Sequence, residues 1–229
     1  HFSFAKQGVP ALYAEGGDEP ADEEPAKYRK RMNVIVTGCY HQVCDEYRED
    51  WDLSGIVQDT QMLFDVGVNV GQTLLKLKSV SKEIEYLGFE PNPIAFHYSK
   101  NLIEINSFQK VTILPVGVSD KSNLGVLNFF SDSTVDASAS MISGFRKEET
   151  VIRKEFIPLF SIADLELINL MDDIAILKID VEGAELEVIK SFYKKIEAYR
   201  PIILMEILPT YSIDHSERIN RQNELIAML

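Results

Sequence analysis

Four short, mainly apolar runs recur along the chain, and an acidic residue follows each of them. The runs cover residues 62–64, 84–89, 174–179 and 201–205. A nearly continuous apolar run of this length is typical of a strand that is buried on both faces of a parallel sheet. The acids that follow are Asp65, Glu90, Asp180 and Glu206. We therefore predict four strands, each with a carboxylate at its carboxyl end.

Stretches with apolar residues at helical spacing follow three of these strands. The apolar stripes consist of Val70, Leu74 and Leu77, then of Ala95, Tyr98, Leu102 and Ile105, and finally of Ala184, Val188 and Phe192 within 182–192. Asn92 is expected to cap the second helix, with Pro93 at its first position. Strands that alternate with helices predict an α/β fold with a doubly wound, mostly parallel sheet. Such sheets bind ligands beyond the carboxyl ends of their strands, where the four acids lie.

The pattern elsewhere is less regular. Residues 111–118 are predicted to form a further strand and residues 126–130 an edge strand. The polar stretch 131–150 is expected to be a mobile loop, and such loops often cover sites. Further expected elements are a short strand at 34–36, a helix at 45–58 that contains Trp51 as a packing residue, and an amphipathic helix at 223–229.

The N-terminal part of the chain differs in composition from the rest. Residues 14–27 are rich in Glu, Asp, Pro and Gly and contain no large apolar residue, so they cannot bury enough surface to offset the entropy of ordering. We expect a flexible acidic segment over 1–31, an extension that packs on the domain over 32–61, and one α/β domain over 62–229. A chain of 229 residues is long enough for one such domain.

Charge and cysteine content exclude some partners. The net charge of −13 and the pI near 4.8 argue against nucleic acid, because phosphate binding needs a basic surface. No apolar run is long enough to span a membrane, so we expect a soluble protein. Its compartment stays open, with the cytoplasm and an organelle matrix as the alternatives. Cys39, His41 and Cys44 lack a second ligand pair, which favours two ordinary thiols over a local disulfide or a partial metal site. No metal site is predicted.

Asp65 is followed by a turn with glycines at both ends, residues 67–71, which we call the glycine turn. Glycine has no Cβ, so the backbone can bend tightly and approach a ligand. Asn69 stands where the dinucleotide-binding fingerprint has its middle glycine, which disfavours a pyrophosphate site. Glu90 ends the next strand, where a carboxylate can accept hydrogen bonds from both hydroxyls of a ribose. The alternative is that these residues have no function: the glycines form a plain strand-to-helix turn, and Glu90 is a solvated carboxylate.

The pattern D-x-G-x-x-x-G that starts at Asp65 resembles the first motif of class I S-adenosylmethionine-dependent methyltransferases, in which the acid holds the ammonium group of the methionine part. Six blocks, in the same order, are similar to those of the FkbM-type methyltransferases, and they are residues 64–71, 88–93, 115–120, 138–142, 178–185 and 200–207. Val68 departs from the alanine that is usual in that family. The resemblance covers about 62–207.

This resemblance implies a Rossmann-like class I fold, S-adenosylmethionine as the cofactor, and methyl transfer, usually to oxygen, in a small molecule or glycan. The cofactor site that it implies consists of Asp65, Gly67, Asn69, Gly71, Glu90, Asn92, Ser119 and Asp120.

Asp180, Glu182 and Glu206, which we call the acidic cluster, are the candidates for orienting the acceptor or removing its proton. The structural alternative is capping and dipole stabilisation of the following helix, which explains Glu182 and Glu185 better than Asp180. His215 is a weaker candidate, because a lone histidine in a linker is more often solvated.

Two classes of function follow from these observations. The first is a methyltransferase, favoured by the complete set of glycines and acids, and the second is a catalytically silent methyltransferase-like scaffold subunit that docks through its acidic N-terminal tail. An NAD-dependent oxidoreductase is disfavoured by Asn69. Class I methyltransferases end in a β-hairpin, which we expect to be absent because the chain ends within the helix at 223–229. The strand at 201–207 would then be an open sheet edge, covered by residues beyond Leu229 or by a partner chain.

Overall fold

The predicted strands lie side by side in one parallel sheet, which we call the central sheet. The computed structural model describes residues 11–12, 62–136, 138–145, 150–165, 174–207 and 216–229. Within these residues the sheet has six strands in the order β1, β9, β8, β2, β3, β4, and all pairs are parallel. Their bounds are Ala11–Leu12 for β1, Met62–Val66 for β2, Glu85–Phe89 for β3, Val111–Leu114 for β4, Ile174–Ile179 for β8 and Ile202–Met205 for β9.

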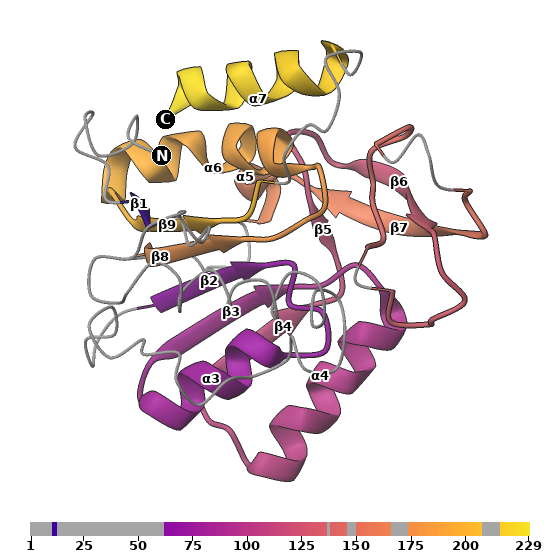
Figure 1. Cartoon of the computed structure of the whole chain (residues 1–229). Coiled ribbons are helices and arrows are strands. Elements are labelled where there is room, and N and C mark those ends of the chain that lie inside the picture. The colour runs from indigo at the N-terminus through magenta and orange to yellow at the C-terminus, as the bar shows by residue number, and fades with distance from the viewer. Residues whose placement is uncertain (1–10, 13–61, 137, 146–149, 166–173, 208–215) are drawn as a thin grey trace, which may run out of the picture.

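Helices cover both faces of the central sheet (Figure 1). On one face lie α3 (Gln72–Val80) and α4 (Pro93–Asn106); on the other lie α5 (Ile162–Leu165) and α6 (Glu185–Tyr199), with α7 (Ser216–Met228) packed outside α6. From β2 the chain moves outward through β3 and β4, and it returns to β8 on the other side of β2. The predicted doubly wound α/β fold is therefore confirmed. Its topological switch point lies between β2 and β8, which is where such folds bind ligands.

An aromatic cluster forms the centre of the core between the sheet and α6. The rings of Phe64, Phe89 and Phe192 are buried, and their centroids lie 5.9 to 6.5 Å apart in tilted or edge-to-face contacts. Such contacts stabilise beyond the burial of area alone. Because Phe64 and Phe89 belong to β2 and β3, this cluster fixes the strand that contains Asp65 and the strand that Glu90 follows.

The helices follow the predicted pattern with three differences. Asn92 caps α4 as predicted, and Pro93 is its first residue. Tyr98 and Ile105 are exposed, because α4 packs through another face, so the predicted stripe is wrong at these two positions. α6 begins at Glu185, later than residue 182, and α7 begins before residue 223.

Of the described strands, three more form a small second sheet at one end of the molecule (Figure 1). They are β5 (Gly117–Val118), β6 (Asn123–Phe129) and β7 (Arg153–Phe160), and β6 pairs with β7 in antiparallel fashion. The prediction of one strand over 111–118 is wrong, because Pro115 separates β4 from β5 and the two pair in different sheets. The predicted edge strand at 126–130 corresponds to β6, whereas β7 has no predicted counterpart.

The stretch 131–150 is partly anchored, contrary to the expectation of a mobile loop. Ser140 is fully buried, and its backbone exchanges hydrogen bonds of 2.9 and 3.0 Å with that of Asn128 in β6. Its hydroxyl donates to the backbone oxygen of Glu182 at 2.6 Å. This loop therefore packs on the acidic cluster.

The expectation of an open edge at β9 is wrong. β1 pairs with β9 in parallel, with Ala11 opposite Ile203 and Leu12 opposite Leu204. These two N-terminal residues fall within 1–31, the segment expected to be flexible, and a strand of two residues is too short to leave a recognisable pattern. Among the described residues, no antiparallel strand joins the central sheet after β9.

Several predictions concern residues outside the described part of the chain. They are the strand at 34–36, the helix at 45–58 with Trp51, the cysteines Cys39 and Cys44 with His41, and His215. The domain boundaries at 31 and 61 stay predictions. In the part of the chain that is described, none of the helices has the length and apolar character needed to cross a bilayer.

Candidate functional site

The four strand-end acids lie along one edge of the central sheet, at the carboxyl ends of neighbouring strands. β3, β2, β8 and β9 are adjacent in that order, and Glu90, Asp65, Asp180 and Glu206 are found at their ends. Backbone hydrogen bonds of 3.0 Å, from Asp180 N to the Val66 oxygen and from Glu206 N to the Ile179 oxygen, continue the pairing as far as the acids. We call this the acidic edge.

The glycine turn has a backbone that other residues would not adopt easily. Gly67 and Gly71 have φ of 92° and 94°, and Asn69 also has a positive φ of 52°. A Cβ on Gly67 would lie 1.8 Å from the backbone oxygen of Asp180, so glycine is required there for packing as well as for conformation. The N–H groups of Gly67 and Val68 both donate to the Phe89 oxygen, at 3.0 and 3.3 Å. The turn is thus fixed to the ends of both β3 and β8.

Glu90 is buried directly beside the glycine turn. One carboxylate oxygen accepts from Asn69 N at 2.6 Å and the other from Asn92 N at 2.8 Å. Each oxygen has a second lone pair, so the carboxylate can accept two more hydrogen bonds, one on each oxygen. Burial raises the pKa of Glu90 to about 7, although the two backbone donors lower it in part. Glu90 is therefore a fixed double acceptor whose charge changes near neutral pH.

Asn92, Ser119 and Asp120 contribute to the structure around this acceptor. The side-chain oxygen of Asn92 accepts from Ile94 N at 3.0 Å, and its amide donates to the Thr134 oxygen at 3.0 Å, so both ends of the side chain are engaged. Ser119 and Asp120 follow β5, and the Ser119 hydroxyl donates to Asp120 at 3.3 Å. The cofactor role of these three residues stays a prediction.

Asp65 is fully buried and is held by two side chains. Tyr86 OH donates to one oxygen at 2.5 Å, and Lys178 Nζ donates to the other at 2.9 Å. Burial raises the pKa of Asp65, and Lys178 opposes this rise. Burial alone would lower the pKa of Lys178, but the charges of Asp65 and Asp180 raise it. The Asp65 carboxylate is thus paired within the protein.

Two acids of the acidic cluster, Asp180 and Glu206, follow β8 and β9, and the third, Glu182, lies in the turn before α6. Glu206 shares a hydrogen bond with Asp180; desolvation of its carboxyl, together with the charges of Asp180 and Glu182, raises the pKa of Glu206 to about 8. Glu182 is buried and has a positive φ of 51°, so it lies in the turn before α6. The Glu206 carboxyl therefore keeps its proton to a higher pH than an ordinary glutamate does.

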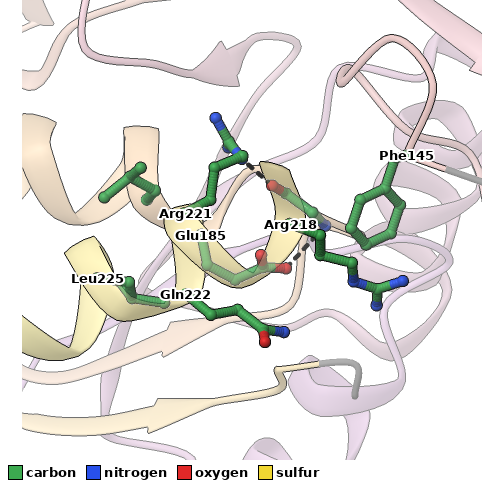
Figure 2. A pocket seen from close by; sticks show the side chains of 8 residues that line it. Phe145, Glu185, Arg218, Arg221, Gln222 and Leu225 are labelled. Carbon is green, nitrogen blue, oxygen red and sulfur yellow. Dashed lines mark hydrogen bonds between the residues drawn. The ribbon is translucent and has the colours of Figure 1, made fainter. Parts of the chain in front are cut away.

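Side chains from three segments hold the turn that contains Glu182 (Figure 2). Glu185 accepts from Gly183 N at 2.8 Å, and Arg221 of α7 donates to the Gly183 oxygen at 3.0 Å. Phe145 packs against Gly183, where a Cβ would lie 2.5 Å from its ring. The guanidinium carbon of Arg218 lies over the same ring, 4.3 Å from its centroid. The Glu185 carboxylate is therefore tied to the turn before α6, and burial raises its pKa to about 7.

The sequence interpretation missed three side chains of this site: Tyr86, Lys178 and Ser140. Lys178 had a usable signal, because a lysine in an otherwise apolar buried strand needs a partner. Tyr86 and Ser140 reach the site only through strand register and loop packing. The described residues contain no group of three or more His, Cys, Asp or Glu side chains arranged to hold a metal ion.

Comparisons with known proteins give a family and several structural similarities. A family model described as Methyltransferase FkbM domain matches residues 65–225. No curated protein matches the chain. Among solved structures, the chain is similar to the methyltransferase FkbM from Methylobacillus flagellatus KT, with 18% identity and a TM-score of 0.49, covering 76% of this chain and 40% of that one.

Two further structures are more distant. Precorrin-6y C5,15-methyltransferase from Geobacter metallireducens GS-15 shows 10% identity and a TM-score of 0.42, covering 76% of this chain and 66% of that one. The N-terminal domain of human METTL16 in complex with SAH shows 12% identity and a TM-score of 0.32, with coverage of 97% and 70%. The chain spans less than two thirds of the first two structures.

Proposed function

The chain belongs to the FkbM methyltransferase family, and we propose that it binds S-adenosylmethionine at the acidic edge and transfers a methyl group to a hydroxyl of a small molecule or glycan. The cofactor would occupy the space beside the glycine turn and Glu90, and the acceptor would approach the acidic cluster. The bound cofactor supplies an activated methyl group on its sulfonium.

The observation that supports this proposal most strongly is the geometry of Glu90. Two backbone N–H groups, from Asn69 and Asn92, fix its carboxylate at 2.6 and 2.8 Å, and each oxygen keeps an acceptor site. The 2′ and 3′ hydroxyls of a ribose are two adjacent donors, which such a carboxylate binds together. Gly67 and Gly71 lie next to it and allow the backbone to approach the rest of the ligand.

The protein's own part in methyl transfer is to align the acceptor and to take its proton. In-line alignment accounts for much of the rate in such a reaction, because the reacting atoms are held at near-attack distance. Asp180 and Glu206 are hydrogen-bonded to each other at the strand ends, with a pKa of about 8 for Glu206. A carboxylate with a pKa near the working pH is a better proton acceptor for a hydroxyl than one with an ordinary pKa. The carboxylate pair is therefore assigned to orienting the hydroxyl and accepting its proton.

Calorimetric titration of the folded chain with S-adenosylmethionine, S-adenosylhomocysteine and NAD tests the proposal without a known acceptor. We expect binding of the first two and none of NAD. Binding of NAD alone would indicate an oxidoreductase, and binding of none of the three would favour the scaffold alternative. Once binding is established, transfer of labelled methyl to panels of hydroxylated small molecules and glycans tests the acceptor class.

A further inference from the structure

Lys178 is a charged residue inside the central sheet, next to the switch point between β2 and β8. In the strand register it lies directly opposite Asp65. Its ammonium group is 2.9 Å from Asp65 Oδ1, 3.0 Å from the backbone oxygen of Gly67 and 3.6 Å from Asp180 Oδ2. One side chain therefore contacts the end of β2, the glycine turn and the acidic cluster.

Each of these contacts has a different consequence. The bond to Asp65 neutralises a fully buried carboxylate, which would otherwise be costly. The bond to the Gly67 oxygen fixes the first peptide of the glycine turn, which packs against the Asp180 backbone. The approach to Asp180 holds that half-exposed carboxylate toward the sheet, because an ammonium group attracts a carboxylate at this distance.

We propose that Lys178 is a positioning residue that connects the cofactor site to the transfer centre: its ammonium group holds the glycine turn and the Asp180 carboxylate in one fixed arrangement. This inference rests on the proposed function, since it assigns the glycine turn to the cofactor and Asp180 to the acceptor. A simpler role is that Lys178 only neutralises Asp65, and a double substitution separates the two roles.

The test compares three variants: Lys178→Met, Asp65→Asn and the double variant Asp65→Asn/Lys178→Met. Lys178→Met leaves a buried carboxylate without its cation, so it should be less stable than the wild type. The double variant removes both charges and should recover most of that stability. If Lys178 positions the glycine turn, the double variant should bind S-adenosylhomocysteine at least about tenfold more weakly than Asp65→Asn. Asp65→Asn removes the carboxylate but keeps the charge-assisted bond from Lys178 to the Gly67 oxygen.

Lys110→Met is the matched control, because Lys110 forms an ion pair of 3.1 Å with Glu83 at the opposite ends of the strands. It should bind S-adenosylhomocysteine as the wild type does. Equal affinities of Asp65→Asn and the stable double variant would overturn the inference and leave neutralisation of Asp65 as the role of Lys178. If Lys178→Met does not fold, the comparison of Asp65→Asn with the double variant decides. Failure of the folded wild type to bind would instead refute the proposed function, and the inference with it.

Discussion

Replacement of Glu90 should separate cofactor binding from stability. In Glu90→Gln the side chain keeps its size but loses the charge and one of the two acceptor oxygens. A hydrogen bond to a charged group contributes roughly 1.5–3 kcal/mol, so the loss of one ribose contact should weaken binding by about 10-fold to 150-fold. In Glu90→Ala both contacts are lost, and the effect should be at least as large. Calorimetry with S-adenosylhomocysteine above pH 7, where the wild-type carboxylate is charged, measures both.

The same substitution should not lower the stability of the free protein by a comparable amount. The pKa of Glu90 rises from 4.5 to about 7 on folding, so the buried charge destabilises the fold above pH 7. Each pKa unit corresponds to about 1.4 kcal/mol, which gives roughly 3 kcal/mol of destabilisation that is absent below pH 4.5. Glu90→Gln removes this destabilisation, although the NH2 group of the Gln side chain then faces one of the two backbone N–H donors. Unchanged affinity in a folded Glu90 variant would refute the assignment, and reduced melting temperature with unchanged affinity would show a structural role.

Further predictions address the rest of the site. Affinity of the wild type for S-adenosylhomocysteine should fall as pH decreases through 7, approaching about tenfold per pH unit, because the protonated Glu90 carboxyl loses acceptor capacity; the same dependence in Glu90→Gln would contradict this. Asp180→Asn should reduce turnover and leave the melting temperature nearly unchanged. Glu185→Ala should lower the stability of the protein by about 1–3 kcal/mol, because it removes the acceptor of Gly183 N. A stability loss in Asp180→Asn and a turnover loss in Glu185→Ala would show that Asp180 is the structural residue and Glu185 the functional one. Gly67→Ala should abolish cofactor binding, since its Cβ would meet a backbone oxygen at 1.8 Å. Gly144→Ala, at φ 70° in open space, should lower the stability by only about 1–2 kcal/mol and preserve binding. Calorimetry and thermal unfolding measure both variants, and equal effects would mean that backbone conformation alone matters.

The central sheet was predictable because its strands are buried on both faces and so appear as continuous apolar runs. β7 was not, because its first three residues are charged and it contains Pro158, which normally argues against an inner strand. The split of residues 111–118 depends on pairing partners that only the folded chain provides. β1 consists of two residues and pairs with a strand near the other end of the chain.

The part of the candidate site that could be predicted consists of residues that stand at or near the ends of strands. Asp65, Glu90 and the glycines stand at positions where the local sequence already indicates a turn. Lys178 and Tyr86 become neighbours of Asp65 only through strand register, over separations of 113 and 21 residues, and no local pattern encodes that register. The sequence suggested Asp65 as the ligand of an ammonium group, and in the structure Asp65 already pairs with the ammonium group of Lys178.

The Phe89 oxygen, which accepts from both Gly67 and Val68, makes the glycine turn part of the hydrophobic core below it. Phe89 itself is immobilised between Phe64 and Phe192. The conformation of the turn that we propose for cofactor binding is thus already stabilised by the fold. A preorganised turn loses little conformational entropy when it binds, so more of the contact energy appears as affinity. Loosening this aromatic cluster should therefore weaken ligand binding through disorder of the turn, even though none of its rings belongs to the acidic edge.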